Sequence, residues 1–154
     1  MIMPVFYIPT SLIVQTIPNG VQKRAIIITA CFMSFIGNLF TGPSYLFGFP
    51  NSIWMMAVGQ AAHGLIDPYI LVPSLPEMIE SVLDYYPGEE TEVNDISSGV
   101  FNMFLGIGQV SGPIFGSLIA NRFGFRVCCD YVAIVSLLFG ILYFIFTNGF
   151  ASFS

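Results

Sequence analysis

Long runs of apolar residues, separated by short polar segments, dominate the chain. A bilayer core about 30 Å thick is crossed by about 20 residues of α-helix, which rises about 1.5 Å per residue. Four runs reach that length almost without charge, and none alternates polar with apolar residues as a half-buried strand does. We therefore predict four full membrane-spanning helices, over residues 25–48, 52–75, 98–120 and 127–147.

A shorter apolar stretch opens the chain, at about 1–17, and is interrupted by two prolines. It predicts either the remainder of a spanning helix or an arm at the membrane interface, and the residues leave both readings open. Turn signals follow at 18–20 (Pro-Asn-Gly) and at 49–51 (Phe-Pro-Asn), where Asn51 or Ser52 is the expected N-cap of the next helix.

One connection, at about 76–97, is long and polar. It holds seven of the nine acidic residues and no Lys or Arg. Residues 74–77 (Ser-Leu-Pro-Glu) have the capping-box pattern, which favours a short amphipathic helix to about Tyr86. A Pro-Gly pair then ends that helix, and the acidic residues as far as Asp95 predict a mobile, solvated loop.

Composition supports a membrane protein and excludes several other classes. Hydrophobic residues make up 55% of the chain and charged residues 8%, where soluble domains are about a quarter charged. The mean hydropathy is +0.81, so lipid is the expected solvent for the surface. Four basic residues in two separate pairs cannot neutralise a run of phosphates, so we expect no nucleic-acid partner.

Metal, cofactor and enzyme chemistry lack support in the residues. The cysteines Cys31, Cys128 and Cys129 lie in apolar runs without metal-ligand spacing, and a single histidine cannot complete a zinc site with them. No nucleophile–base pair or phosphate-binding loop is evident. We therefore expect no metal, no cofactor and no enzymatic activity.

Three passages of the sequence resemble the major facilitator superfamily of secondary transporters. They are GPS at 42–44 with FP at 49–50, VPSLPEM at 72–78, and GQVSGPIFG at 108–116 followed by RFGFR at 122–126. In order and spacing they look like helices nine to twelve of that fold, with 1–17 as the end of helix eight. The closest similarity is to the drug and vesicular amine branch.

The resemblance implies an incomplete bundle, because a full member has twelve helices in two halves. The chain, taken as one domain over 1–154, would form most of the C-terminal half. It would need the missing N-terminal half, or a partner helix bundle, besides the lipid bilayer. The resemblance also implies that the acidic loop and the C-terminus are cytoplasmic, and that the solute is a small organic molecule, such as an organic cation exchanged for protons.

The candidate site residues for solute binding and proton coupling are His63, Asp67 and Gln60. His63 and Asp67 lie four residues apart, on one face of a predicted helix, with Gln60 on the same face. An ionisable group at membrane depth is costly and usually faces a cavity or a partner. A structural reading stays open: Asp67 caps a half-helix that restarts at Pro68, and His63 donates one hydrogen bond to a neighbouring helix.

A glycine stripe is the second candidate feature. Gly108, Gly112 and Gly116 recur every four residues and so line one helix face, which permits close helix packing in a membrane. Pro113 removes a helical hydrogen bond and permits a bend, so this element and Pro68 are candidate packing and hinge positions. In the superfamily such a Gly-Pro element is associated with antiporters.

The last candidate is an interfacial ion pair between Arg126 and Asp130, four residues apart near a predicted helix start. Taken together, the sequence predicts part of a secondary active transporter that works by alternating access. The alternative is a non-transporting membrane subunit that docks in a larger complex.

Overall fold

The computed structural model describes residues 2–16, 22–44, 48, 50 and 52–147. Every regular element in these ranges is an α-helix, which confirms the all-α fold. The helices are α1 (Ile2–Gln15), α2 (Lys23–Thr41), α3 (Ile53–Leu83), α4 (Glu90–Phe123) and α5 (Phe125–Phe146).

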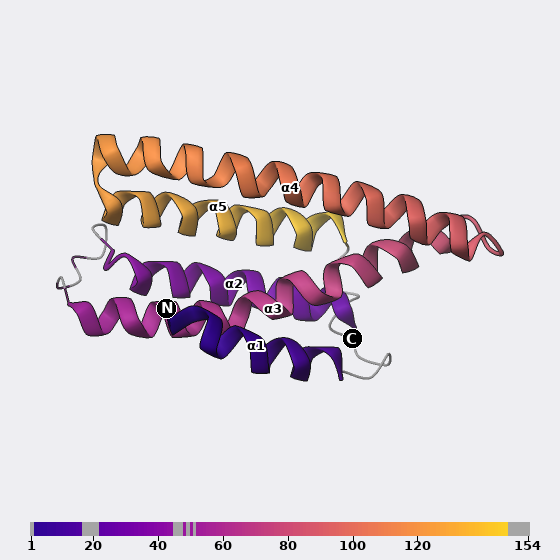
Figure 1. Cartoon of the computed structure of the whole chain (residues 1–154), viewed down its shortest axis with the longest axis horizontal. Coiled ribbons are helices and arrows are strands. Elements are labelled where there is room, and N and C mark those ends of the chain that lie inside the picture. Colours follow the sequence, from indigo (N-terminus) through magenta and orange to yellow (C-terminus); the bar gives the residue numbers. More distant parts are fainter. Residues whose placement is uncertain (1, 17–21, 45–47, 49, 51, 148–154) are drawn as a thin grey trace.

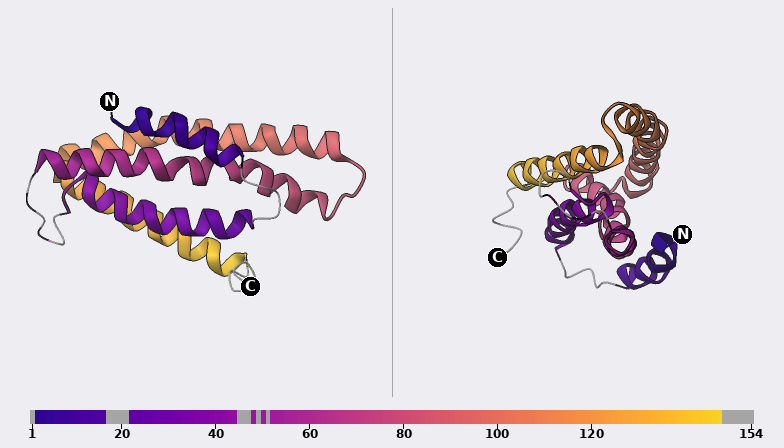
Figure 2. Two further views of the ribbon diagram at one scale, coloured as in Figure 1. Left: turned by 90° about the horizontal axis from the view of Figure 1, so that it is seen from below. Right: turned by 90° about the vertical axis from the view of Figure 1, so that its left-hand side faces the viewer.

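Helix α3 is the centre of the bundle. It packs against α1 on one side and α2 on another, and α5 packs against α2 (Figures 1 and 2). Helix α4 lies outermost, beside α5, and meets α3 where the two form a hairpin. With 34 residues, α4 is about 50 Å long at the usual helical rise. This length exceeds the thickness of a bilayer core. The α3–α4 hairpin projects beyond the other helices at one end (Figure 1).

Three helices in the described part of the chain, α2, α4 and α5, are long and apolar enough to cross a membrane. Helix α3 is long enough, with 31 residues, but is not among these three. Its apolar run is diluted by Gln60, His63 and Asp67, so its membrane span stays a prediction. Helix α1 is a shorter apolar helix packed along α3.

Close glycine contacts hold α3 between its neighbours. A Cβ on Gly59 would lie 2.4 Å from the backbone nitrogen of Thr41, at the end of α2. A Cβ on Gly64 would lie 2.4 Å from the carbonyl oxygen of Met3 in α1. Both distances are far below a van der Waals contact, so only glycine permits these helices to approach so closely. The buried side chains of the core come from α1, α2, α3 and α5, with Val93 of α4.

The predicted acidic loop is wrong from Glu90 onward, and the short helix predicted to about Tyr86 is the continuous end of α3. Helix α3 continues without a break to Leu83, so residues 74–77 do not start a helix, and the Ser74 hydroxyl donates to the Ile70 carbonyl inside it. Helix α4 already begins at Glu90. The physical reason is that acids in a first helical turn interact favourably with the positive end of the helix dipole. The connection is therefore a short turn in which Gly88 has a φ of +99°.

Helix α2 ends at Thr41, earlier than the predicted boundary at 48. Pro43 explains the stop, because the residue before a proline is disfavoured in the helical conformation. Ser52 is the N-cap of α3, as expected, but its side chain makes no capping hydrogen bond. The predicted turn at 18–20 and the alternative cap Asn51 lie outside the described residues.

Candidate solute and proton site

The structure brings His63 and Asp67 together on the face of α3. Their side chains are joined by a hydrogen bond of 3.2 Å between His63 Nδ1 and Asp67 Oδ1. The His63 side chain is 13% exposed and that of Asp67 is 30% exposed. An imidazole and a carboxylate at this distance can share or pass one proton, which is the chemistry that a proton-coupling site requires.

The other imidazole nitrogen of His63 is buried and has no hydrogen-bond partner among the described residues. The ring lies against Gly37 of α2, where an added Cβ would be 3.4 Å from Nε2. When Nδ1–H donates to Asp67, Nε2 is a bare buried acceptor, and when the ring is protonated, Nε2–H is a buried donor. Both states leave a buried polar atom without a partner in the described chain, which is uncommon in folded proteins and requires an explanation.

The structure does not support the reading in which Asp67 caps a restarted half-helix. Helix α3 passes through Pro68, which is fully buried, without starting again. The bond between His63 and Asp67 also stays within one helix, so the expected bond from His63 to a neighbouring helix is absent from the described chain. Gln60 is half-buried, one turn before His63, and its side chain makes no hydrogen bond to the described residues.

The glycine stripe of α4 faces open space. Around Gly108, Gly112 and Gly116, an added Cβ would meet no atom within 4 Å. None of the apolar window of α4 is buried, and Pro113 lies inside the helix on its exposed surface. The predicted close packing is therefore not made within the described part of this chain. It stays a prediction for helices outside it.

Arg126 holds the end of α2. Its Nε donates to the Pro43 carbonyl at 2.6 Å, and its Nη2 donates to the Ser44 carbonyl at 3.4 Å. Asp130, one turn further along α5, is buried. A charged donor at the C-terminus of a helix is favourable for the helix dipole. The predicted ion pair with Asp130 stays a prediction beside this observed role.

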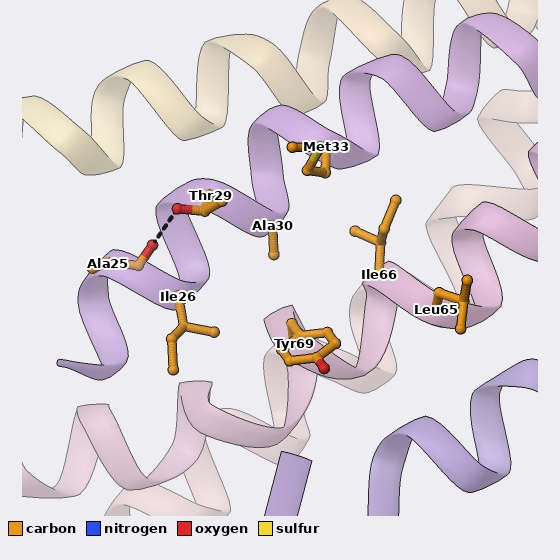
Figure 3. A pocket seen from close by; sticks show the side chains of 8 residues that line it. All are labelled: Ala25, Ile26, Thr29, Ala30, Met33, Leu65, Ile66 and Tyr69. Carbon is orange, nitrogen blue, oxygen red and sulfur yellow. Dashed lines mark hydrogen bonds between the residues drawn. The ribbon is translucent and has the colours of Figure 1, made fainter. Parts of the chain in front are cut away.

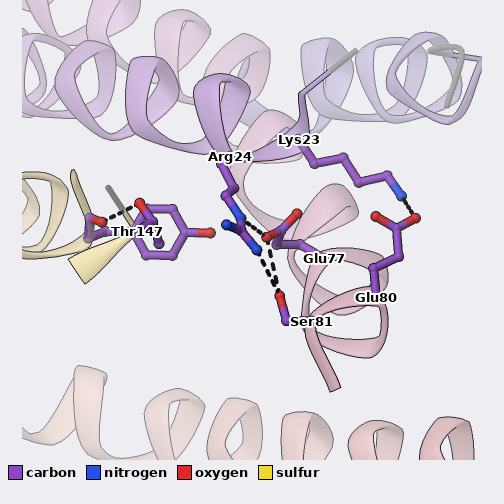
Figure 4. Close-up of polar contacts among 7 residues, drawn as sticks. Lys23, Arg24, Glu77, Glu80, Ser81 and Thr147 are labelled. Carbon is purple, nitrogen blue, oxygen red and sulfur yellow. Dashed lines mark hydrogen bonds and ion pairs between the residues drawn. The ribbon is translucent and has the colours of Figure 1, made fainter. Parts of the chain in front are cut away.

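A polar cluster that the sequence analysis missed lies where α2 begins. Arg24 is ion-paired with Glu77 of α3 and donates to the Ser81 hydroxyl at 3.2 Å, while Lys23 is ion-paired with Glu80 (Figure 4). The partners are separated by 53 and 57 residues, so no local pattern reveals them. A usable signal was the alternation of the helices, which places the start of α2 and the later part of α3 at the same end of the bundle.

A cavity of about 480 Å³ lies between α2 and α3 and is almost purely apolar (Figure 3). The Thr29 hydroxyl in its wall is already bonded to the Ala25 carbonyl at 2.8 Å. The cavity therefore offers little to recognise a polar solute. No group of three or more metal-ligating side chains occurs among the residues that the structure describes.

Comparison with known proteins finds similarity to part of a membrane transporter. The chain is 25% identical over 114 residues to the MFS-type transporter SLC18B1 of Mus musculus, and equally to that of Rattus norvegicus. The match covers 68% of this chain but only 24% and 25% of those proteins, so it spans about a quarter of their length. No family model matches the chain, and no solved structure matches it.

This similarity supports the major facilitator superfamily, and together with the apolar helices it supports an integral membrane protein.

Proposed function

We propose that the chain forms part of a secondary active transporter that moves small organic solutes, organic cations among them, in exchange for protons. The observation that carries the proposal is the His63–Asp67 hydrogen bond with its orphaned Nε2. An ionisable pair at membrane depth costs several kcal/mol, roughly 2.5–3.5 for an aspartate on insertion scales. A purely structural helix gains nothing that offsets this cost.

The exchange of solute for proton follows because the Asp67 carboxylate can pair with a proton or with a cationic solute. When the pair carries an additional proton, as an imidazolium beside the carboxylate, it has no net charge to offer a solute. When an organic cation approaches Asp67, its charge favours loss of that proton. The 30% exposure of the Asp67 side chain gives a solute access, whereas His63 lies deeper, against Gly37. Binding of the solute and release of the proton are thereby coupled at one place.

The rest of the transporter would be supplied by further helices. The relatives are about four times longer than the matched stretch, and α4 presents a glycine face that no described residue covers. Alternating access requires two bundles that rock about a central site. We assign the open face of α4, with Pro113 as a hinge, to the contact with the second bundle, and the acidic turn between α3 and α4 to the cytoplasmic side.

The direct test is proton release upon solute binding. Protein purified with its associated helices, in weakly buffered detergent with a pH-sensitive dye, is titrated with a panel of monovalent organic amines. We expect the amines to release protons from the wild type and from the control Asp95→Asn, which lies in the first turns of α4. Asp67→Asn should abolish the release. Equal release from Asp67→Asn and wild type would sink the proposed coupling site.

The alternative, a non-transporting subunit, is favoured by one observation, the uncovered glycine face of α4. A subunit of this kind would dock other helices on that face and would need no proton chemistry. It predicts that Asp67→Asn leaves the assembly intact and changes no proton release, because none occurs in the wild type.

A further inference from the structure

A cavity at one end of the bundle has chemistry that the proposed transport site does not use. It has a volume of about 520 Å³ and is lined by residues of α2, α3, α4 and α5. It shares no residue with the group formed by Gln60, His63 and Asp67. Four of its lining residues are aromatic, namely Phe101, Phe139, Tyr143 and Phe146. Its charged lining residues are Arg24 and Glu77.

Glu77 offers this cavity an unused acceptor. Its side chain is 13% exposed. One carboxylate oxygen, Oε1, accepts from Arg24 Nε and, at 3.4 Å, from the Ser81 hydroxyl. The other oxygen, Oε2, has no hydrogen bond to the described part of the chain. An ionised carboxylate can accept about four hydrogen bonds, so Oε2 remains open to a donor that enters the cavity.

The aromatic wall adds a second attraction for a cation. The rings of Phe139 and Tyr143 are stacked, with centroids 6.1 Å apart and planes 21° apart. The face of an aromatic ring is negative and attracts an ammonium group placed over it. The Tyr143 hydroxyl also makes no hydrogen bond to the described residues, and it is a further acceptor. Arg24, by contrast, already has a charged partner in Glu77 and donates to Ser81 through Nη2, so an anion would compete with the Glu77 carboxylate for the guanidinium.

We propose that this cavity, which we call the Glu77 cavity, binds an organic amine with an apolar or aromatic body. The ammonium group donates to Glu77 Oε2 and lies against Tyr143 and Phe139, while the apolar body fills the space beside Phe101 and Phe146. Arg24 competes with the ligand for the same carboxylate. The inference goes beyond the proposed function, because the site lies at the end of the bundle and requires no transport.

Equilibrium binding of 2-phenylethylamine to the full chain in lipid nanodiscs tests the proposal, with 2-phenylethanol as the uncharged isostere. We expect the amine to bind at least about tenfold more tightly than the alcohol, because only the amine is charged. Glu77→Gln should weaken amine binding about tenfold or more. Arg24→Gln should tighten it, because the competing guanidinium is gone.

Glu80→Gln is the matched control. Glu80 is also paired with a basic residue of α2, three positions from Glu77, but it does not line the cavity. It should leave amine binding unchanged. All binding is measured in the Asp67→Asn background, which removes the proposed transport site, so that the amine reports on the Glu77 cavity alone. Phe139→Leu breaks no ion pair and should weaken binding of the amine more than that of the alcohol, so it carries the test if an ion-pair variant fails to fold.

Three results would overturn the proposal: equal binding of amine and alcohol, unchanged amine binding in folded Glu77→Gln, or weaker amine binding in folded Arg24→Gln. The last result would instead indicate an anionic ligand. Loss of amine binding in Asp67→Asn alone would assign the amine to the transport site and also overturn the Glu77 cavity. Because the readout is binding, a failure of transport leaves these outcomes unaffected.

Discussion

Substitution of Gly59 by alanine should push apart α2 and α3 at one of the two tightest glycine contacts in the described bundle. The new Cβ would lie 2.4 Å from the Thr41 nitrogen and 2.6 Å from its Cα, which are backbone atoms that cannot rotate away. Restoring a van der Waals distance of about 3.4 Å requires α3 to move about 1 Å from the end of α2. Overpacking of this kind costs about 1–3 kcal/mol. Alanine regains up to about 1 kcal/mol of helix propensity over glycine, so we expect a net loss of about 1–2 kcal/mol.

Gly112→Ala is the matched control, because its Cβ would meet no atom within 4 Å. In the isolated chain it should leave stability unchanged or raise it slightly. The assay is thermal unfolding in detergent micelles followed with a thiol-reactive fluorogenic dye, which reports exposure of the buried cysteines Cys31, Cys128 and Cys129. A Gly112→Ala chain that unfolds at a lower temperature than Gly59→Ala would refute the assignment of close packing to Gly59.

Three further predictions concern the remaining contacts. In the native assembly, Gly112→Ala should weaken association with the other helices, although it is neutral in the isolated chain. Co-purification measures this association, and an unchanged yield would contradict docking on the glycine face of α4. Arg126→Gln should destabilise the chain by about 1.5–3 kcal/mol, which is the usual contribution of hydrogen bonds to a charged group. The control is Arg122→Gln, which should be tolerated because Arg122 is exposed. Equal unfolding temperatures of the two variants would contradict this. Glu80→Gln should cost less than about 1 kcal/mol, because the Glu80 side chain is 58% exposed, and a larger loss would contradict a surface pair.

Local patterns predicted the features that depend on neighbours in the sequence. The apolar runs located the helices, because a span is recognised from length and hydropathy alone. The His63–Asp67 pair was found because residues four apart share a helix face. The acidic turn was mispredicted because Glu90 and Glu92 suit a solvated loop and a helix N-terminus equally well.

Tertiary contacts were beyond the reach of such patterns. The pairing of Arg24 with Glu77 joins residues 53 apart and depends on how α2 and α3 pack. The glycines showed the same limit. Regular spacing drew attention to Gly112 and its neighbours, but the structure makes its closest contacts at Gly59 and Gly64. Spacing tells which residues share a face, and not which face meets another helix.

Solute uptake into proteoliposomes is the strongest test of proton-coupled transport by this protein. The protein, purified from its native membrane with its associated helices, is reconstituted with an imposed pH gradient and supplied with radiolabelled organic amines. We expect accumulation above protein-free liposomes that collapses when a protonophore dissipates the gradient and is lost in Asp67→Asn. Uptake no greater than in protein-free liposomes, for every amine in the panel, would contradict it.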